Sequence, residues 1–284
     1  NGEYVDGFPI SFNGTFNHGS SVADLNLDGM PEIIASSNEG MIVAINSVGE
    51  LIPGFPFTLS SNISTSSTIA NIDMDDELEI VLGVADGSLY IINYDGSSSQ
   101  TYFLDGAICS GLSIADLDQN GLMEIIFNTD DNQLHAWEPE TQMELGGWPV
   151  SFHEKSITEP IVVDLNNDLI LEVISATIAG DIYITKYDGS SFENFPFLSD
   201  DSIQYTPAIG DLDGDNDYEL IVGTKNNLKV IDILDDAGAQ YSWSVFRGNT
   251  HRNGFYDTGQ SYLNNRVSEL PFEFKLSKNY PNPF

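Results

Sequence analysis

The segment that decides the fold is Asp24-Leu25-Asn26-Leu27-Asp28-Gly29-Met30-Pro31-Glu32, an acidic loop that returns four more times along the chain. The other copies are NIDMDDELE at 71–79, DLDQNGLME at 116–124, DLNNDLILE at 164–172 and DLDGDNDYE at 211–219. The five loops begin at positions 24, 71, 116, 164 and 211, so they lie 47, 45, 48 and 47 residues apart. A regular period near this length indicates a repeat architecture, in which each repeat is one supersecondary unit.

Each loop lies between two short apolar segments. In the second repeat, residues 68–70 precede the loop and the run at 80–84 follows it. Short segments rich in β-branched residues favour strands over helices. An Asp86-Gly87 pair then marks a tight turn, because both residue types tolerate positive φ, and it leads to a third strand at 89–92. The other four repeats show the same order of segments.

An aromatic-proline segment follows in three repeats, at 55–57, 148–150 and 195–197. Proline cannot donate to a β-ladder, so this fourth strand is expected at the edge of its sheet. Four short antiparallel strands per repeat predict an all-β protein, a β-propeller of about five visible four-stranded blades over residues 1–256. An all-β sandwich is the alternative, and the near-identical repetition of the segments disfavours it.

The two ends of the propeller leave alternatives open. Residues 7–10 have the sequence of a fourth strand although they precede the first loop, and residues 243–246 supply a fourth strand for the fifth blade. Either the N-terminal strand closes the ring against the last blade, or it is the remnant of a further blade upstream. We expect the second alternative, because the C-terminal end of the sequence also resembles an interrupted domain.

The spacing of oxygen atoms in the loops predicts sites for a hard cation. Side-chain oxygens at positions 1, 3, 5 and 9, together with a backbone carbonyl at position 7, suit calcium, which takes roughly six to eight oxygen ligands at loose geometry. Magnesium is disfavoured, because it demands stricter octahedral geometry and keeps several waters. The alternative without a metal is a set of acidic turns closed by hydrogen bonds from Asp and Asn side chains.

Position 6 of each loop is expected to turn through positive φ. Gly29 and Gly121 meet this need, and Asp76 and Asn216 tolerate it, whereas Leu169 in the fourth loop is strained there. The fifth loop carries the most carboxylates. We therefore expect the fifth or the first loop to bind most tightly and the fourth loop to bind most weakly.

The composition narrows the classes of function. Among 284 residues, 9 Lys and Arg stand against 44 Asp and Glu, which gives a net charge of −35. Such a surface repels nucleic acid and anionic membranes, whose binding requires clustered basic residues. Cys109 is the only cysteine, so the chain has no internal disulfide and no cysteine-based zinc site. No apolar run is long enough to cross a bilayer.

No convincing catalytic set is present in the sequence. The four histidines, His18, His135, His153 and His251, are scattered, and we expect His135 to be packed rather than catalytic. Phosphate-binding loops, metalloprotease helices and serine nucleophile elbows are absent from the sequence. Residues 246–254 form the densest basic segment, which is either a structural cap or a small anion site. A glycosidase-type pair of carboxylates stays possible, although the acids concentrate in the loops.

The loop pattern, with a following Val-Gly and an Asp-Gly turn, resembles the FG-GAP/VCBS-type repeats of integrin-like calcium-binding propellers over about residues 5–246. The resemblance implies calcium held by the side chains at positions 1, 3, 5 and 9 and by the carbonyl at position 7. The implied ligands are Asp24, Asn26, Asp28, Met30 and Glu32; Asn71, Asp73, Asp75, Glu77 and Glu79; Asp116, Asp118, Asn120, Leu122 and Glu124; Asp164, Asn166, Asp168, Ile170 and Glu172; and Asp211, Asp213, Asp215, Asp217 and Glu219.

Such propellers serve both as adhesion modules and as accessory domains of enzymes. We expect a non-catalytic binding or adhesion module for an unknown protein or glycan. The alternative is the propeller of a secreted enzyme, such as a calcium-dependent polysaccharide lyase or a peptidase. Lyases that act on anionic sugars need a cationic surface, and this chain offers few basic residues before position 246, which favours binding.

The last nine residues, Leu276-Ser277-Lys278-Asn279-Tyr280-Pro281-Asn282-Pro283-Phe284, resemble the opening of the C-terminal sorting domain of type IX secretion cargo. We accordingly expect a polar linker at 257–270 and the start of a truncated sorting domain at 271–284. The resemblance implies recognition by a secretion machinery. It also implies that the protein lies outside the cell or on the outer surface of a Gram-negative bacterium.

Overall fold

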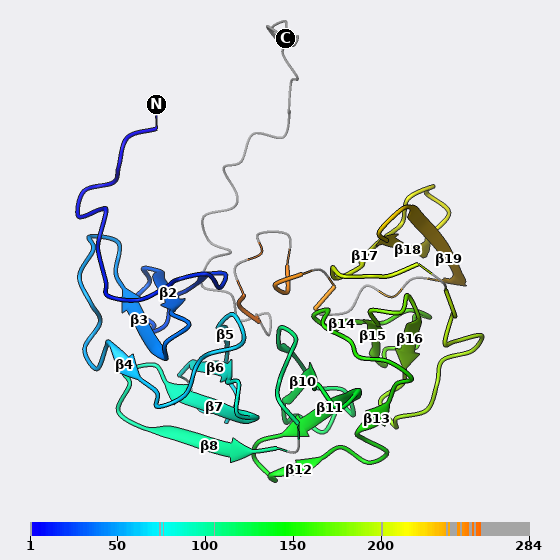
Figure 1. Cartoon of the computed structure of the whole chain (residues 1–284), viewed down its shortest axis with the longest axis horizontal. Coiled ribbons are helices and arrows are strands. Elements are labelled where there is room, and N and C mark those ends of the chain that lie inside the picture. Colours follow the sequence, from blue (N-terminus) through cyan, green and yellow to red (C-terminus); the bar gives the residue numbers. More distant parts are fainter. Residues whose placement is uncertain are drawn as a thin grey trace, which may run out of the picture.

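The computed structural model describes residues 2–73, 75, 77–104, 106–199, 201–236, 238, 243–244, 246–249, 252 and 254–256. Over these residues the chain forms only strands and loops, and nineteen strands build five antiparallel sheets. The sheets follow one another around an arc that is open between the first and the last (Figure 1). Sheets repeated radially in this way are the blades of a β-propeller, which confirms the predicted fold class. No helix suited to crossing a membrane is found in the described part.

The blades are counted from the N-terminus. The first contains β1 (Ser21–Ala23), β2 (Glu32–Ser36), β3 (Met41–Ile45) and β4 (Phe57–Thr58). The second contains β5 (Thr68–Ala70), β6 (Glu79–Gly83), β7 (Ser88–Asn93) and β8 (Ser99–Phe103). The third contains β9 (Ser113–Ala115), β10 (Glu124–Asn128), β11 (Gln133–Glu138), β12 (Met143–Glu144) and β13 (Val150–Ser151). The fourth contains β14 (Ile161–Val163), β15 (Glu172–Ala176) and β16 (Ile182–Thr185). The fifth contains β17 (Ala208–Gly210), β18 (Asp217–Gly223) and β19 (Leu228–Asp236).

The acidic loop joins the first two strands of every blade, as the sequence predicts. The residue before position 1 pairs with the position-9 glutamate, for example Ala23 with Glu32 and Ala70 with Glu79. This antiparallel ladder holds the two ends of each loop beside one another. The loop ligands are therefore positioned by the pair of inner strands of each blade.

The outer strands agree with the prediction only in part. β4 and β13 begin directly after the cis bonds Phe55-Pro56 and Trp148-Pro149, and both lie at a sheet edge. In the fourth blade the predicted strand is reduced to one bridge between Ile182 and Phe197. The fourth and fifth blades thus have three strands each over the described residues, which corrects the expectation of four.

The N-terminal segment does not form the expected strand. Residues 8–12 have no assigned β-structure, and a side chain at Gly7 would collide with the carbonyl of Val48 in the first blade. Gly54 packs in the same way on the turn at Asp95 in the second blade. The segment at 7–9 therefore contacts the first blade in the way that the segment around Gly54, from the first blade, contacts the second. It does not pair with the last blade.

Adjacent blades share apolar cores. Leu25, Ile34 and Ile42 of the first blade cluster with Ile69 and Ile80 of the second. Hydrogen bonds also join the inner strands of adjacent blades. Ser21 Oγ donates to the carbonyl of Ser67, Thr68 Oγ1 to the carbonyl of Leu112, and Ser113 Oγ to the carbonyl of Pro160. The first three interfaces between blades therefore combine buried apolar surface with a buried polar bond, and both stabilise the arc.

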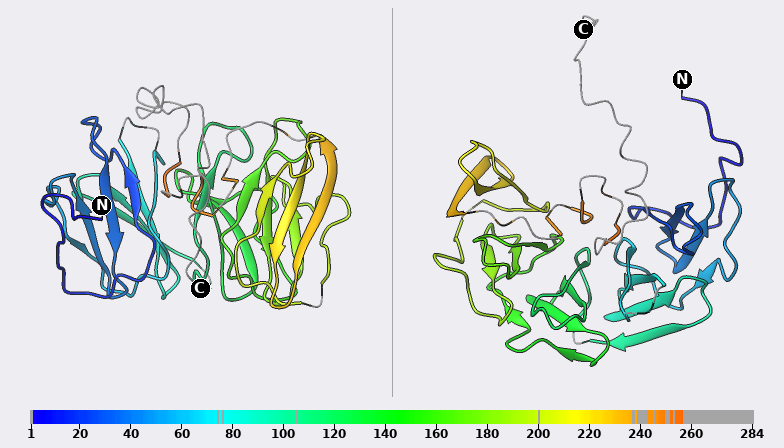
Figure 2. Two further views of the ribbon diagram at one scale, coloured as in Figure 1. Left: turned by 90° about the horizontal axis from the view of Figure 1, so that it is seen from above. Right: turned by 180° about the vertical axis from the view of Figure 1, so that it is seen from behind.

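The face of the fifth blade that points away from the fourth is uncovered. Leu212 and Leu228 are 63% and 72% exposed, whereas Leu165 and Ile182, at the same positions of the fourth blade, are 0% exposed. In the fourth blade these positions belong to the core shared with the fifth. Figure 2 shows the fifth blade at the end of the arc, so no sixth blade covers these leucines among the described residues.

The described residues between 243 and 256, called the axial segment here, return to the middle of the arc (Figure 1). Trp243 forms a bridge with Val162 of β14, and Phe255 forms a parallel bridge with Ile69 of β5. The prediction that residues 243–246 give the fifth blade its outer strand is therefore wrong. This part of the chain pairs instead with the inner strands of the second and fourth blades.

Candidate metal centres

The position-9 glutamate of every loop is buried and holds the main chain of its own loop by a hydrogen bond. All five are buried: Glu32, Glu79, Glu124, Glu172 and Glu219. In each, Oε2 accepts the main-chain N–H of position 2, at 2.9 Å from Leu25, 2.8 Å from Ile72, 2.7 Å from Leu117 and 2.9 Å from Leu165, and likewise from Leu212. The acceptor in these bonds is Oε2 and not Oε1.

The remaining loop carboxylates bind the backbone of their own loop. Position 1 accepts the N–H of position 6 through Oδ2, as in Gly29 to Asp24 at 2.8 Å and Leu169 to Asp164 at 3.1 Å. Position 5 accepts the N–H of position 7, as in Met30 to Asp28 at 2.8 Å. These bonds curl the backbone around the side chains, so the oxygens converge. The carbonyl role implied for position 7 stays a prediction.

Backbone conformation explains part of the loop sequences. Position 6 has positive φ in Gly29, Gly121, Leu169 and Asn216, and the value of 71° at Leu169 confirms the expected strain. Asp76 lies outside the described residues. Position 4 also has positive φ, which the sequence reasoning missed. It does so in Leu27, Gln119, Asn167 and Gly214. The glycine at 214 was the one signal that could have revealed this second turn.

Three of the loops bring carboxylates together. Ligand atoms of Asp73, Asp75 and Glu79 lie within 4.8 Å of one another, and so do those of Asp116, Asp118 and Glu124. The fifth loop forms two such groups that share Glu219. Among the described residues the first and fourth loops form no such group, and both carry Asn at position 3. Several loops could therefore hold a metal ion.

The carboxylates repel one another when no cation is bound. Burial, together with smaller contributions from neighbouring loop aspartates, raises the pKa of Glu79 and Glu124 to about 8 and that of Glu172 to about 7. Burial also raises the pKa of Glu32. In the fifth loop, a hydrogen bond with Asp215 raises the pKa of Asp217 to about 7. A divalent cation would reverse this repulsion.

Buried oxygens without a partner mark the third loop as the best fit for a cation. Asp116 Oδ1 and Glu124 Oε1 are fully buried and have no hydrogen-bond donor. An orphaned buried carboxylate oxygen is costly, and a metal ion supplies the missing positive charge. At the second loop, a small cavity of about 20 Å³ adjoins Asp73 and Glu79. A space of this size holds a single water or ion.

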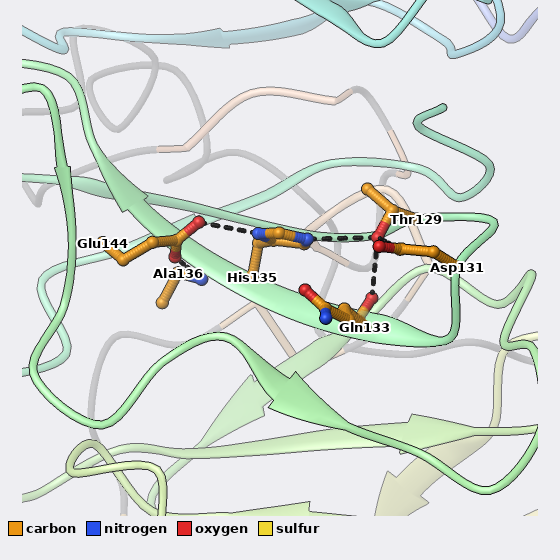
Figure 3. A network of polar contacts seen from close by, with 6 residues as sticks. All are labelled: Thr129, Asp131, Gln133, His135, Ala136 and Glu144. Atoms are coloured by element: carbon orange, nitrogen blue, oxygen red, sulfur yellow. Dashed lines mark hydrogen bonds and ion pairs between the residues drawn. The ribbon is translucent and has the colours of Figure 1, made fainter. Parts of the chain in front are cut away.

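His135 is packed, as the sequence predicts. His135 is buried in β11, where Nδ1 contacts Glu144 Oε1 at 2.6 Å and Nε2 contacts Thr129 Oγ1 at 3.1 Å (Figure 3). Its ring stacks on Phe127. The thiol of Cys109 donates to two carbonyls, and burial raises its pKa to about 11, so it is inert at neutral pH. His251 lies outside the described residues.

The basic axial segment is a structural element rather than an anion site at Arg247. Its buried guanidinium donates to the carbonyls of Ser20 and Ser67 at 2.9 and 3.1 Å and to Ser21 Oγ at 2.8 Å. Glu159 Oε1 in turn accepts the main-chain N–H of Arg247 at 2.6 Å and the indole N–H of Trp243 at 2.7 Å. These bonds tie the first, second and fourth blades together.

A cleft of about 360 Å³ opens beside the axial segment. Gln204 and Tyr205 of the fifth blade, Phe246 and Arg252 of the axial segment and the buried Glu159 of the fourth blade line it. Tyr205 is 78% exposed and Phe246 is 45% exposed, so both aromatic faces are available to a ligand. Sequence reasoning did not find this cleft, because its residues come from four separate parts of the chain, including Gly111 of the third blade.

The sequence and the fold were compared with known proteins. A family model described as the lambda-carrageenase beta-propeller domain matches residues 6–102, which correspond to the first two blades. Among proteins with curated functional descriptions, no sequence matches this chain.

Solved structures that resemble the chain include BBS1N in complex with ARL6DN, BamB from Moraxella catarrhalis and Sqt1 from Saccharomyces cerevisiae. Their TM-scores are 0.55, 0.52 and 0.58, at 17%, 14% and 14% identity, and each match covers 76% of this chain. The chain spans 61%, 63% and 59% of those proteins, respectively. At this level of identity the likeness concerns the fold alone, and the chain is a β-propeller whose inner loops gather carboxylates into candidate metal centres.

Proposed function

We propose that the chain is a calcium-stabilised binding module that works outside the cell. The observation that supports this best is the pair of buried, unpartnered oxygens of Asp116 and Glu124 within a group of three carboxylates. Loops of oxygen ligands with flexible geometry suit calcium better than magnesium, and sulfur or nitrogen ligands that would favour zinc are missing from the loop sequences. Calcium at such sites fastens the inner strands of each blade.

The test is to count bound calcium by equilibrium dialysis of the whole chain. We expect four ions per chain, in the first, second, third and fifth loops, with dissociation constants of about 0.1–1 mM, as in extracellular modules. Glu124→Gln keeps the bond from Leu117 but removes the charge, so it should lose one ion. No bound calcium at about 2 mM free ion would overturn the proposal, and micromolar affinity would contradict the extracellular setting.

A second candidate function is saccharide binding at the axial cleft. It is supported by the carrageenase propeller model over residues 6–102 and by the exposed aromatic faces of Tyr205 and Phe246 beside Arg252. Aromatic walls with a few polar groups are typical of small-molecule sites, and a guanidinium recognises anionic substituents. The net charge of −35 makes a single basic contact more consistent with a binding cleft than with an anionic-sugar lyase.

Titration calorimetry with lambda-carrageenan oligosaccharides and with a neutral glucan tests this candidate. Tyr205→Ala should weaken binding of the preferred sugar about tenfold, the loss expected for one aromatic stacking contact. Tyr4→Ala is the matched control, because Tyr4 is also 78% exposed and does not line the cleft. Equal effects of the two substitutions, or no binding of either sugar, would remove the candidate.

A further inference from the structure

One residue of the third strand faces each acidic loop. The ladder pairs Glu79 with Asn93 and Glu219 with Asp232. In the other three blades the ladder stops one pair short of the position-9 glutamate, and continuing it by one pair gives the residue opposite that glutamate. This places Asn46 opposite Glu32, Glu138 opposite Glu124 and Lys186 opposite Glu172. Cross-strand partners point to the same face of a sheet, with Cβ atoms about 5 Å apart.

Contacts in two blades show that this residue reaches the loop. In the third blade, the buried Glu138 accepts a hydrogen bond from Asn120 Nδ2 at 2.8 Å through Oε2. In the second blade, Asn93 lines the same small cavity as Asp73 and Glu79. The residue opposite the position-9 glutamate, called the facing residue here, is therefore part of the surroundings of any bound ion.

The facing residue differs in charge from blade to blade. It is a neutral amide in the first two blades, a carboxylate in the third and fifth, and the ammonium of Lys186 in the fourth. Lys186 Nζ lies 5.6 Å from the centroid of the Phe192 ring, and the pairing of Val173 with Thr185 puts Lys186 on the same face of the sheet as Glu172. The ammonium thus acts on the same carboxyl group that a metal ion would contact.

The first and fourth loops provide a natural comparison. Both have Asp, Asn, Asp and Glu at positions 1, 3, 5 and 9, so their side-chain ligands are the same. Their sequences differ at positions 4, 6, 7 and 8, and position 6 sets Gly29 against the strained Leu169. They also differ in the facing residue, which is Asn46 in the first blade and Lys186 in the fourth. A cation fixed beside the loop repels a second cation, and at short range this effect exceeds a modest backbone strain.

Building on the proposed function, in which the loops bind calcium, we propose that the facing residue decides which loops hold an ion. Glu138 and Asp232 add a carboxylate and strengthen the third and fifth sites. Asn46 and Asn93 leave the first and second sites to their loop ligands. Lys186 keeps the fourth loop free of calcium, because its ammonium neutralises the loop in place of the metal.

The experiment introduces the facing residue of the first two blades into the fourth. Lys186→Asn should bind five calcium ions in equilibrium dialysis where the unsubstituted chain binds four. Its fourth site should bind at least about tenfold more tightly than before, as expected when a nearby like charge is removed. Lys186→Met, which keeps the aliphatic stem over Phe192, should show the same gain. Lys225→Asn removes the same charge from an exposed turn residue and should leave the count at four.

Thermal melting gives a second readout. In chelator, Lys186→Asn should melt below the unsubstituted chain, because the loop carboxylates lose their internal cation. In millimolar calcium this deficit should disappear. A chain that binds no calcium at all contradicts the proposed function. A chain that binds four ions with or without Lys186, or five ions already with Lys186 present, overturns the role of the facing residue and leaves the proposed function intact.

The third blade provides the complementary test. Glu138→Gln should weaken one calcium site about tenfold, the change expected when one carboxylate near the ion becomes neutral. The melting temperature in chelator should stay the same or rise, because repulsion within the loop falls. An unchanged calcium affinity would remove Glu138 from the set of facing residues that act on metal binding.

Discussion

Removing calcium is expected to lower the melting temperature of this protein by about 10 °C. A site held at tenfold above its dissociation constant adds about 1.4 kcal/mol of stability, and three such sites add about 4 kcal/mol. For a chain of this size, 1 kcal/mol corresponds to about 2–4 °C. The measurement is thermal melting by circular dichroism, first in about 2 mM calcium and then in excess chelator. This calcium concentration is of the order needed to fill such sites. An equal shift from magnesium at the same ionic strength would show general screening of the −35 charge instead.

The effect of calcium should depend on pH in a definite direction. In the metal-free chain the pKa of Glu79 and Glu124 is raised to about 8. The folded state therefore binds more protons than the unfolded state between about pH 4.5 and 8. Stability of the metal-free chain should fall as the pH rises through this range, and the shift on adding calcium should be larger at pH 8 than at pH 5.5. Glu124→Gln should flatten this dependence, and a metal-free chain more stable at pH 8 would contradict the assignment.

Arg247→Met is expected to destabilise the protein by about 3 kcal/mol or more, with and without calcium. The methionine keeps most of the apolar stem but removes the bonds that the guanidinium donates to the carbonyls of Ser20 and Ser67 and to the hydroxyl of Ser21. Three oxygens then lose charge-assisted hydrogen bonds, and the loss is most costly at Ser67 and Ser21, where the bonds are buried and water does not replace the donor. Urea unfolding followed by fluorescence measures the change in free energy.

Arg252→Met is the matched control for this prediction. Arg252 is exposed, and its substitution should change the free energy of unfolding by less than about 0.5 kcal/mol. Equal effects of the two substitutions would mean that the axial segment contributes only general charge. If the loss of stability in Arg247→Met disappeared in calcium, the axial segment would be coupled to the metal loops. The hydrogen bonds of Arg247 go to other residues, so we expect no such coupling.

The repeat could be read from the sequence because its signals are local. The apolar strands, the acidic loop and the Asp-Gly turn recur within about 25 residues, so the inner strands and the buried position-9 glutamates follow from spacing alone. The strain at Leu169 was predictable for the same reason. The sites were predictable as groups of oxygens, but the identity of the ion is not a property of spacing.

The errors arose where partners are distant in the chain. The sequence around Trp243 resembles an edge strand, and no nearby residue indicates that Trp243 pairs with Val162 rather than with β19. The facing residues were missed although each follows its glutamate by 14 positions in the first four repeats, as in Glu32 and Asn46 or Glu172 and Lys186. Their meaning needs the ladder register, which the sequence does not state.

The bonds of the axial segment also set an order of events during folding. Each blade is built from contacts between residues close in sequence, so blades can form one after another as the chain emerges. Arg247, in contrast, reaches Ser67 and Ser20 across 180 and 227 residues. Contacts over such separations form late and slowly, because a long loop must first be closed. The axial segment is therefore expected to dock last. Before it docks, the carbonyls of Ser20 and Ser67 lack the hydrogen bonds from Arg247, and the inner strands are more accessible to proteases and chaperones.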